Sequence, residues 1–233
     1  MSLEIQNLCG RFARYSTPSQ FSETIIPFRV NPREEISSSF NISPSQKALI
    51  VRDNDGHHVG VSMKWGLEPN WTGSGKNRLI INARSETMDK KSLFRVGFRS
   101  KRCLVLCDGY YEWKNTGTGS KKPYYVFSPN EKPFCMAAIF DYKNGNLGDA
   151  DEHFVIITKA AHPSVSGIHH RMPIRLPKDA QAEWLNQANK SMSDLKELLS
   201  AVDSYWTAYP VSRFVNAPGN NAMTCIERYQ ETD

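Results

Sequence analysis

Three short segments of the sequence carry side chains that could perform nucleophilic or acid–base chemistry. Cys9 stands in LCGRF, Glu112 in CDGYYEWK and His169 in GIHHRMP. A cysteine served by a histidine base can act as a nucleophile, and carboxylates and imidazoles transfer protons near neutral pH. Each residue also has a simpler interpretation: a buried cysteine beside a turn glycine, an ordinary strand carboxylate and a loop histidine bonded to backbone. Taken singly, the three residues decide nothing.

A second group of polar residues lies in the segment INARSE. Asn82, Arg84 and Glu86 alternate there, so they would share one face of a strand. The same pattern fits a solvated strand edge equally well. Trp65 in KWGLEP would by default belong to the core. These residues gain meaning only from their combination with the first group.

The elements that must position these side chains are mainly short strands. Strand patterns separated by turn-forming segments cover 47–53, 58–65, 78–83, 101–108, 123–127, 134–140 and 153–160. Helical patterns are confined to 91–100, 177–188 and 193–202, with Ser193 as the expected N-cap of the last. Several strands follow one another without intervening helices, which disfavours a doubly wound sheet. The prediction is a single α+β domain with a largely antiparallel, partly barrel-like β-sheet and a few peripheral helices.

Composition and charge exclude some classes of protein. The net charge of +5, from 29 basic and 24 acidic residues, permits binding to a polyanion without requiring it. The five cysteines are an odd number, and Cys103 and Cys107 would share one face of a strand, so we expect reduced core cysteines. The sequence lacks metal-ligand spacing, a cofactor motif, a signal peptide and a membrane span. We therefore expect a cytoplasmic protein with no metal, no cofactor and no membrane contact.

The order of the motifs resembles the SRAP family, the SOS-response-associated peptidases that sense abasic sites in single-stranded DNA. The motifs are LCGRF, NISP, KWGL, INARSE, CDGYYEWK, MAAIF, FVIIT, IHHRMP and YPVSRFVN, and they run from Cys9 to about Asn220. The resemblance implies one SRAP domain over 9–233, preceded by a leader or extension at 1–8. It also implies a monomer that binds abasic single-stranded DNA and associates with the nucleoid when bound.

The resemblance implies a role for each candidate residue. Cys9 matches the family's N-terminal cysteine, Glu112 its catalytic carboxylate, and His169 the catalytic histidine of the HxR motif. Asn82 matches a residue that holds the DNA backbone beside the lesion, and we count it with the catalytic group. The residues expected to contact the strand through a cation or an aromatic ring are Arg11, Arg84, Arg171 and Trp65.

The chemistry of an abasic sugar explains why these residue types are needed. Its open-chain form carries an aldehyde at C1′, to which a neutral amine adds to give an imine. An N-terminal amine, with an ordinary pKa of about 7.7–8.0, is appreciably neutral at physiological pH. The thiol of Cys9 can then close onto the imine carbon, and the product is a thiazolidine ring. Glu112 would accept protons from the amine, and His169 would donate a proton to the sugar-ring oxygen as it opens.

The start of the chain departs from the family pattern. Eight residues, MSLEIQNL, precede Cys9, so its nitrogen is an amide that cannot form an imine. Residues 1–8 could be removed by cleavage before Cys9, could reflect a start placed too early, or could be a cloning extension. We favour the last two explanations, because Leu8 stands where an initiator methionine would be.

Two functions from other classes remain open. One is a cysteine peptidase, with Cys9 as nucleophile and His169 as base, acting on other chains or only on its own leader. The other is a non-catalytic binder of single-stranded nucleic acid. Only the crosslinking function predicts an adduct with abasic DNA that resists denaturation, and only a general peptidase predicts turnover of an unrelated peptide.

Overall fold

Strand β7 (Arg102–Cys107) shows how the sequence builds the centre of the fold. Every one of its residues is buried, because side chains that point to opposite faces of the strand enter two different cores. Leu104 and Leu106 pack under helices, whereas Cys103, Val105 and Cys107 point to the other side. All five cysteines of the chain are free and buried, which confirms the prediction for Cys103 and Cys107.

The structure is a computed structural model. It describes residues 9–32, 34, 37–68, 79–117, 119–142, 152–189, 191–201 and 205–230. The expected leader at 1–8 lies outside the described residues, as does the first residue of the strand expected at 78–83.

The larger sheet curls into a ring. Its eight strands are β2 (Arg29–Val30), β4 (Lys47–Asn54), β5 (His57–Trp65), β6 (Asn82–Arg84), β7, β10 (Phe134–Tyr142), β11 (Glu152–Ala160) and β12 (Arg171–Pro173). Antiparallel pairs join β5, β4, β7, β10 and β11 in that order, and a parallel pair between β11 and β5 closes the circle. The predicted α+β domain with a largely antiparallel, partly barrel-like sheet is therefore confirmed.

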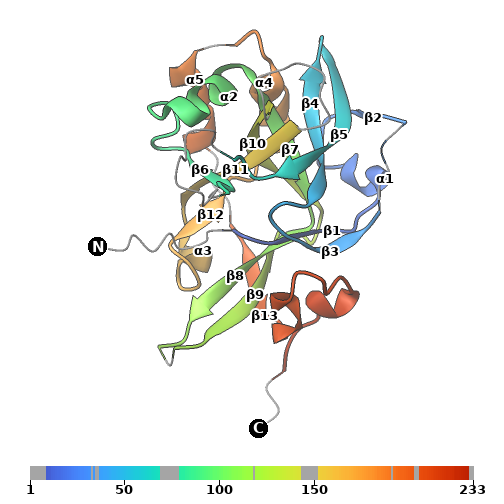
Figure 1. Ribbon diagram of the computed structural model, residues 1–233, viewed down its shortest axis with the longest axis vertical. Coiled ribbons are helices and arrows are strands. Elements are labelled where there is room, and N and C mark those ends of the chain that lie inside the picture. Colours follow the sequence, from blue (N-terminus) through green and yellow to red (C-terminus); the bar gives the residue numbers. More distant parts are fainter. Residues whose placement is uncertain are drawn as a thin grey trace.

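The second sheet extends away from this ring. It has the order β13-β9-β8-β1-β3, formed by β1 (Phe12–Arg14), β3 (Ser39–Ile42), β8 (Gly109–Asn115), β9 (Lys121–Phe127) and β13 (Thr207–Pro210). Only Asp108 separates β7 from β8, so one continuous stretch of chain joins the two sheets. The Asp108 carboxylate accepts hydrogen bonds from the main-chain nitrogens of Tyr15 and Ser16, which ties the end of β1 to this junction. Figure 1 shows the β8–β9 hairpin projecting below the ring.

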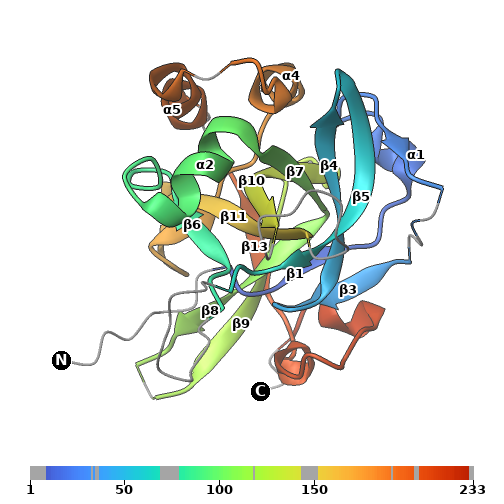
Figure 2. The same ribbon diagram turned by 45° about the horizontal axis from the view of Figure 1, so that its top comes forward.

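The helices lie around the ring, and the three longest of them cover one side of it. The helices are α1 (Pro18–Phe21), α2 (Ser92–Ser100), α3 (Pro163–Ser166), α4 (Lys178–Leu185) and α5 (Met192–Ala201), followed by the 3₁₀ turns η1 (Arg213–Asn216) and η2 (Met223–Cys225). In Figures 1 and 2, α2, α4 and α5 lie together over the top of the ring. Ser193 is not the N-cap of α5, because the helix has already begun at Met192; the Ser191 hydroxyl instead accepts from the Asp194 amide. Within the described residues, no helix is long and apolar enough to cross a membrane.

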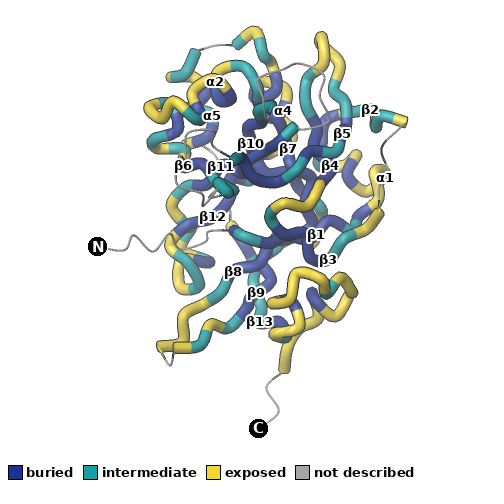
Figure 3. The backbone as a smooth tube through the Cα atoms, in the orientation of Figure 1, coloured by how far each residue is buried: buried dark blue, intermediate teal, exposed yellow. Residues whose placement is uncertain are grey.

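Two apolar cores lie on the two sides of the ring wall. One fills the space under α2, α4 and α5, around Phe98 and Trp184. The other fills the interior of the ring and includes Trp65, Phe154 and the candidate residue Cys9. Figure 3 shows the buried strands at the centre and the exposed tip of the β8–β9 hairpin. The candidate site thus begins at the edge of a packed core.

Candidate active site

The pairing of β1 with β8 brings Cys9 to Glu112. Phe12 lies opposite Tyr110, and the Tyr111 amide donates to the Arg11 carbonyl, so the chain before β1 runs beside the middle of β8. The main-chain nitrogen of Cys9 donates a hydrogen bond of 2.8 Å to Oε1 of Glu112. Cys9 has no exposed surface, and its φ of 34° is in the left-handed region that non-glycine residues seldom adopt. Two catalytic candidates that lie 103 positions apart in the sequence are therefore in direct contact.

Burial sets the ionisation of this pair. Glu112 is only 3% exposed, and burial raises its pKa to about 8, against the opposing effects of hydrogen bonds from the Cys9 and Trp113 amides and the charge of Lys121. Burial, and then the charge of Glu112, raise the pKa of the Cys9 thiol well above its ordinary value. Glu112 therefore exchanges its proton near physiological pH, and the Cys9 thiol stays protonated until a base removes its proton.

His169 completes the group from the turn between α3 and β12. Its Nδ1 lies 4.0 Å from Oε1 of Glu112. The Arg171 amide donates to the same Nδ1 over 3.1 Å, so a neutral His169 carries its proton on Nε2. Burial lowers the pKa of His169, and the charges of His170, Lys121 and Arg171 lower it further, although a backbone hydrogen bond with Arg171 opposes them. The histidine is thus neutral at physiological pH and has an Nε2–H that can donate.

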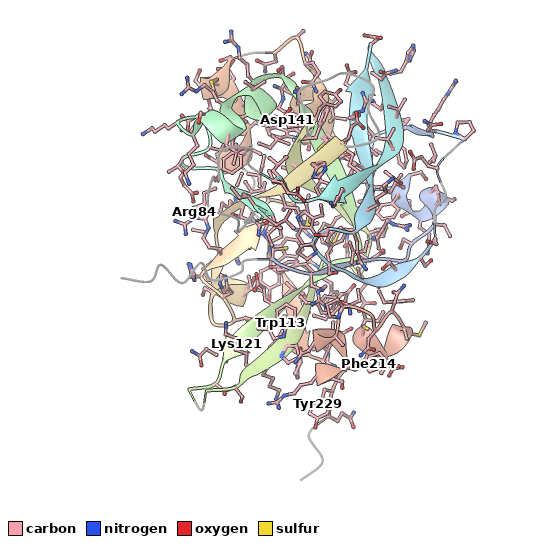
Figure 4. All side chains as sticks on the ribbon, in the orientation of Figure 1. Arg84, Trp113, Lys121, Asp141, Phe214 and Tyr229 are labelled. Carbon is pink, nitrogen blue, oxygen red and sulfur yellow. The ribbon has the colours of Figure 1, made fainter. Side chains whose placement is uncertain are left out.

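Strand β6 approaches the same site through β11. Ile156 of β11 lies opposite Asn82, and Thr158 lies opposite Arg84 on one side and Pro173 of β12 on the other. Strand β11 is therefore flanked by both motif-bearing strands, β6 and β12. Asn82 is half-buried and Arg84 is exposed. In Figure 4, Arg84 lies at the outer edge of the molecule beside β6.

The remaining residues expected to bind the strand occupy different environments. Arg11 is buried, and its guanidinium donates to the Asn41 side chain and to the Val215 carbonyl, each over 2.8 Å. Arg171 is also buried, and it forms two hydrogen bonds to the Glu86 carboxylate. Both guanidinium groups are engaged within the protein, and only Arg84 is openly exposed.

Trp65 does not occupy the surface position expected for it. Its side chain has no exposed area, stacks on Phe154 and contacts the edge of Phe12. Its indole nitrogen donates to the Ile81 carbonyl. The simpler interpretation as a core residue fits this position, because no face of the ring is open to a base.

Trp113 is an aromatic residue beside the site that the sequence reading did not select. It follows Glu112 in β8 and is half-buried, and its indole nitrogen donates to the Asn216 side chain over 2.9 Å. The guanidinium carbon of Arg11 lies 5.8 Å from the centre of the indole ring. Figure 4 places Trp113 between the β8–β9 hairpin and the C-terminal turns. In the sequence, the signal that pointed to Trp113 was its position directly after Glu112.

The site is built from proton-transferring side chains rather than from a metal-binding cluster. Among the residues that the structure describes, no three His, Cys, Asp or Glu side chains are grouped closely enough to hold a metal ion. The contacts of Glu112 with the Cys9 nitrogen, and its proximity to His169, suit transfer of protons to and from that nitrogen.

Comparison with known proteins finds relatives that align with most of this chain. The protein is 34% identical to the abasic site processing protein YoqW of Bacillus subtilis over 228 residues, covering 95% of this chain and all of the relative. It is 29% identical to the abasic site processing protein YedK of Escherichia coli, covering 94% of this chain and 99% of the relative. The abasic site processing protein HMCES of Xenopus tropicalis is also 29% identical, with 85% and 68% covered.

Solved structures share the fold of this chain. A phage-related protein from Bordetella bronchiseptica superimposes with a TM-score of 0.71 at 28% identity, covering 87% of this chain and 94% of that one. A protein from Bacteroides thetaiotaomicron gives a TM-score of 0.68 at 27% identity, with 84% and 87% covered. The profile of the family described as SOS response associated peptidase (SRAP) matches residues 8–218. The chain belongs to the SRAP family.

Proposed function

We propose that this protein processes abasic sites in single-stranded DNA by forming a thiazolidine crosslink through the amino and thiol groups of Cys9. The observation that carries the proposal is the 2.8 Å hydrogen bond from the Cys9 main-chain nitrogen to Glu112. In a chain that begins at Cys9, this nitrogen is the α-amine. Relatives that align over nearly their whole length are named abasic site processing proteins, which supports the substrate class.

The first step joins the amine to the sugar. The neutral Cys9 amine attacks the C1′ aldehyde of the open-chain sugar, and the resulting carbinolamine loses water to form an imine. Glu112 takes the proton that the amine releases on attack. Its raised pKa of about 8 makes it a stronger base than an ordinary carboxylate, and it is poised near the pH at which it works.

The second step closes the ring. The Cys9 sulfur adds to the imine carbon, and the thiol proton moves to the nitrogen, by way of Glu112, so that one water is lost overall. Burial keeps this thiol protonated, so the ring forms only after a base takes the proton. A 1,2-aminothiol is required, which excludes the four internal cysteines as crosslinking residues.

His169 assists by opening the sugar. The Arg171 amide donates to Nδ1, so Nε2–H of the neutral ring can donate a hydrogen bond to the sugar-ring oxygen. The fraction of His169 that is protonated gives this oxygen its proton as the ring opens, and water takes the proton of the C1′ hydroxyl as C1′ becomes an aldehyde. The same nitrogen can take the proton back when the adduct reverses. The lowered pKa of His169 keeps it neutral between these events.

Residues around this centre would hold the strand. Arg84 is exposed beside half-buried Asn82, and the two would contact the backbone next to the lesion. Trp113 offers a partly exposed ring on which a flanking base can stack without regard to its identity. We propose single-stranded DNA as the partner because there the sugar and the flanking bases are accessible without the unstacking and unpairing cost of extrusion from a duplex.

Removal of residues 1–8 is the second candidate activity. The Cys9 nitrogen, bonded to Glu112, would be the leaving group if water cleaved the bond between Leu8 and Cys9. A carboxyl group with a pKa of about 8 is largely protonated at pH 7 and can supply the proton that this nitrogen needs. Such a cleavage would yield the free amine that the crosslink requires, and the family's description as peptidases agrees with it.

The test compares two forms of the protein on an oligonucleotide with one abasic site. Protein beginning at Cys9 should form an adduct that survives denaturing electrophoresis and has the mass of protein plus DNA minus one water. Protein in which intact mass shows residues 1–8 retained should form none. Cys9→Ala in the shorter form keeps the amine, so it should be trapped only by borohydride. Equal crosslinking by the form that retains residues 1–8 would refute the mechanism.

A further inference from the structure

Glu86 and Arg171 form an ion pair at the edge of the candidate site. Nη1 and Nη2 of Arg171 donate to the two carboxylate oxygens of Glu86 over 2.5 and 2.9 Å. The Arg171 side chain is 10% exposed, whereas that of Glu86 is 47% exposed. The guanidinium is therefore fixed in the protein wall, and the carboxylate lies on its solvent side.

The arginine is held in place by other contacts as well. Nη2 of Arg171 also donates to the Thr158 carbonyl over 2.7 Å, in the strand between β6 and β12. Its main-chain amide holds Nδ1 of His169. Neither contact involves Glu86, so the guanidinium would keep its orientation if the carboxylate moved away.

Glu86 lies in the field of two arginines. Burial alone would raise its pKa, but the hydrogen bond and charge of Arg171 and the charge of Arg84 bring the pKa below its ordinary value. The position of this carboxylate is therefore favourable for any anion. The planar guanidinium fork presents the same two N–H groups to a carboxylate and to a phosphate.

From this geometry we propose that Glu86 occupies, in the free protein, the position on Arg171 that a DNA phosphate takes in the complex. Glu86 is then an internal competitor that the strand displaces. The proposal rests on the DNA-binding function proposed above. It explains how Arg171 serves as a phosphate ligand although its guanidinium is already paired.

The exchange is feasible because the pair is partly solvated and the carboxylate has space to move. A phosphate accepts the same two charge-assisted hydrogen bonds from the guanidinium fork, so its arrival offsets the loss of the Glu86 carboxylate, whose side chain is 47% exposed. A cavity of about 340 Å³ adjoins Glu86 and is lined by Lys159 and His162, among others. Glu86 can turn into this space and remain near a cation.

The exchange also leaves the catalytic histidine undisturbed. A phosphate brings a negative charge to Arg171 as the carboxylate leaves, so the charge next to His169 stays balanced. The amide that fixes the His169 tautomer belongs to the main chain and does not move with the carboxylate. Glu86 therefore pairs with the Arg171 guanidinium until the DNA strand binds, and it takes no part in the crosslinking reaction.

The experiment measures non-covalent affinity of the full chain for an undamaged single-stranded oligonucleotide. Glu86→Gln should bind up to about five-fold more tightly at low salt, equivalent to about 1 kcal/mol, because no carboxylate then competes with the phosphate for Arg171. Glu86→Asp keeps the charge but is one methylene shorter, so its affinity should lie between those of wild type and Glu86→Gln. Neither gain should depend on base sequence, because phosphate contacts do not specify bases.

A matched control removes the same charge nearby. Asp89 lies three residues along the chain and pairs with Lys196 over 3.0 Å. Asp89→Asn should leave the affinity unchanged. An equal gain in this variant would show a general charge effect and overturn the proposal. Weaker binding by Glu86→Gln or Glu86→Asp would also overturn it, because Glu86 would then position Arg171 for binding.

A second variant tests whether the increase in affinity from Glu86→Gln depends on Arg171. The crosslinking assay tests the proposed function separately from this competition. In an Arg171→Lys background, which loses the fork but keeps the charge, the gain from Glu86→Gln should shrink to less than two-fold. A full gain in that background contradicts the competition. Failure of protein beginning at Cys9 to crosslink abasic DNA would refute the proposed function, whatever the affinities for undamaged strands.

Discussion

Two buried charged groups on consecutive strands of different sheets, Arg102 in β7 and Glu112 in β8, have opposite surroundings in the fold. Arg102 has no exposed surface, yet its guanidinium donates to five main-chain carbonyls. These carbonyls lie at or just beyond the C-terminal ends of α2 and α4, where a helix leaves acceptors unpaired and carries a partial negative charge. They belong to Phe98, Arg99, Trp184, Asn186 and Asn189. Burial still lowers the Arg102 pKa to about 10, so the group remains charged at physiological pH.

Glu112 receives much less compensation. Backbone amides of Cys9 and Trp113 donate to it, but burial outweighs them and holds its pKa near 8. Arg102 therefore keeps one protonation state and fastens two helices, whereas Glu112 can change its state at physiological pH. The contrast shows that a buried ionisable group is suited to proton transfer when the fold gives it too few hydrogen-bond partners to hold it in one protonation state.

The largest expected effect comes from removing the proton acceptor at Glu112. In protein beginning at Cys9, Glu112→Gln keeps the shape and an acceptor for the Cys9 nitrogen but loses the base. Adduct formation should slow by about 10²-fold or more, the range for positioned proton transfer. Single-turnover rates on abasic DNA measure this. Binding of undamaged single strands should be unchanged, and a parallel loss of binding would assign Glu112 a structural role.

The complementary substitution is Arg102→Met. It removes the donor from five carbonyls, of which those of Phe98 and Trp184 are buried. Each buried group left unsatisfied costs about 1–3 kcal/mol, and water can solvate the others. We expect a loss of about 2–3 kcal/mol in the free energy of unfolding, measured by urea titration. The adduct rate per folded molecule should equal that of wild type. A slower rate in fully folded Arg102→Met would break the comparison, because the structural cation would then affect the chemistry.

The sequence predicted the long strands well, since their apolar patterns are continuous. The strands expected at 47–53, 58–65, 134–140 and 153–160 correspond to β4, β5, β10 and β11, with ends that differ by at most two residues. It did not predict closure of the ring, because the parallel pair between β11 and β5 joins residues about 90 positions apart. Short strands such as β1 and β12, three residues each, carry too few residues for a period to show.

The candidate site was only partly readable from the sequence. The motifs identified Cys9, Glu112 and His169, and the structure brings all three together. The burial of Trp65 agrees with its default interpretation as a core residue and not with the DNA contact that the resemblance implied, because motif position says nothing about which face of a strand enters a closed ring. The pairing of Arg171 with Glu86 was also missed, since it depends on β11 placing β6 and β12 side by side.

The pH dependence of stability sharpens the comparison further. Glu112 has an ordinary pKa of 4.5 when unfolded and about 8 when folded, so between these values the native state holds a proton that the unfolded state has lost. Wild-type stability should therefore fall as pH rises from about 5 to 8. Glu112→Gln lacks this dependence, and its advantage over wild type should grow from pH 5 to pH 8 by roughly 3 kcal/mol, because each pKa unit is equivalent to about 1.4 kcal/mol. Urea titrations of both proteins at pH 5 and pH 8 measure it, and an advantage that shrinks with pH would contradict the raised pKa.

The smallest effect concerns Arg84, the exposed counterpart of Arg102. An exposed cation can neutralise a DNA phosphate and release the counterion condensed there, whereas a buried guanidinium saturated by carbonyls cannot reach a phosphate. The affinity of the full chain for undamaged single strands should fall with salt, with a log–log slope of about −0.7 for each phosphate neutralised. Arg84→Ala should make that slope shallower by roughly 0.7 and weaken binding similarly for all base sequences. At saturating protein and low salt, the adduct rate of the form beginning at Cys9 should largely recover, unlike that of Glu112→Gln.

Lys90→Ala provides an exposed control that loses the same charge on the turn after β6 and should keep the wild-type slope. If the slope for Arg84→Ala is also that of wild type, Arg84 neutralises no phosphate and serves only as solvated surface charge.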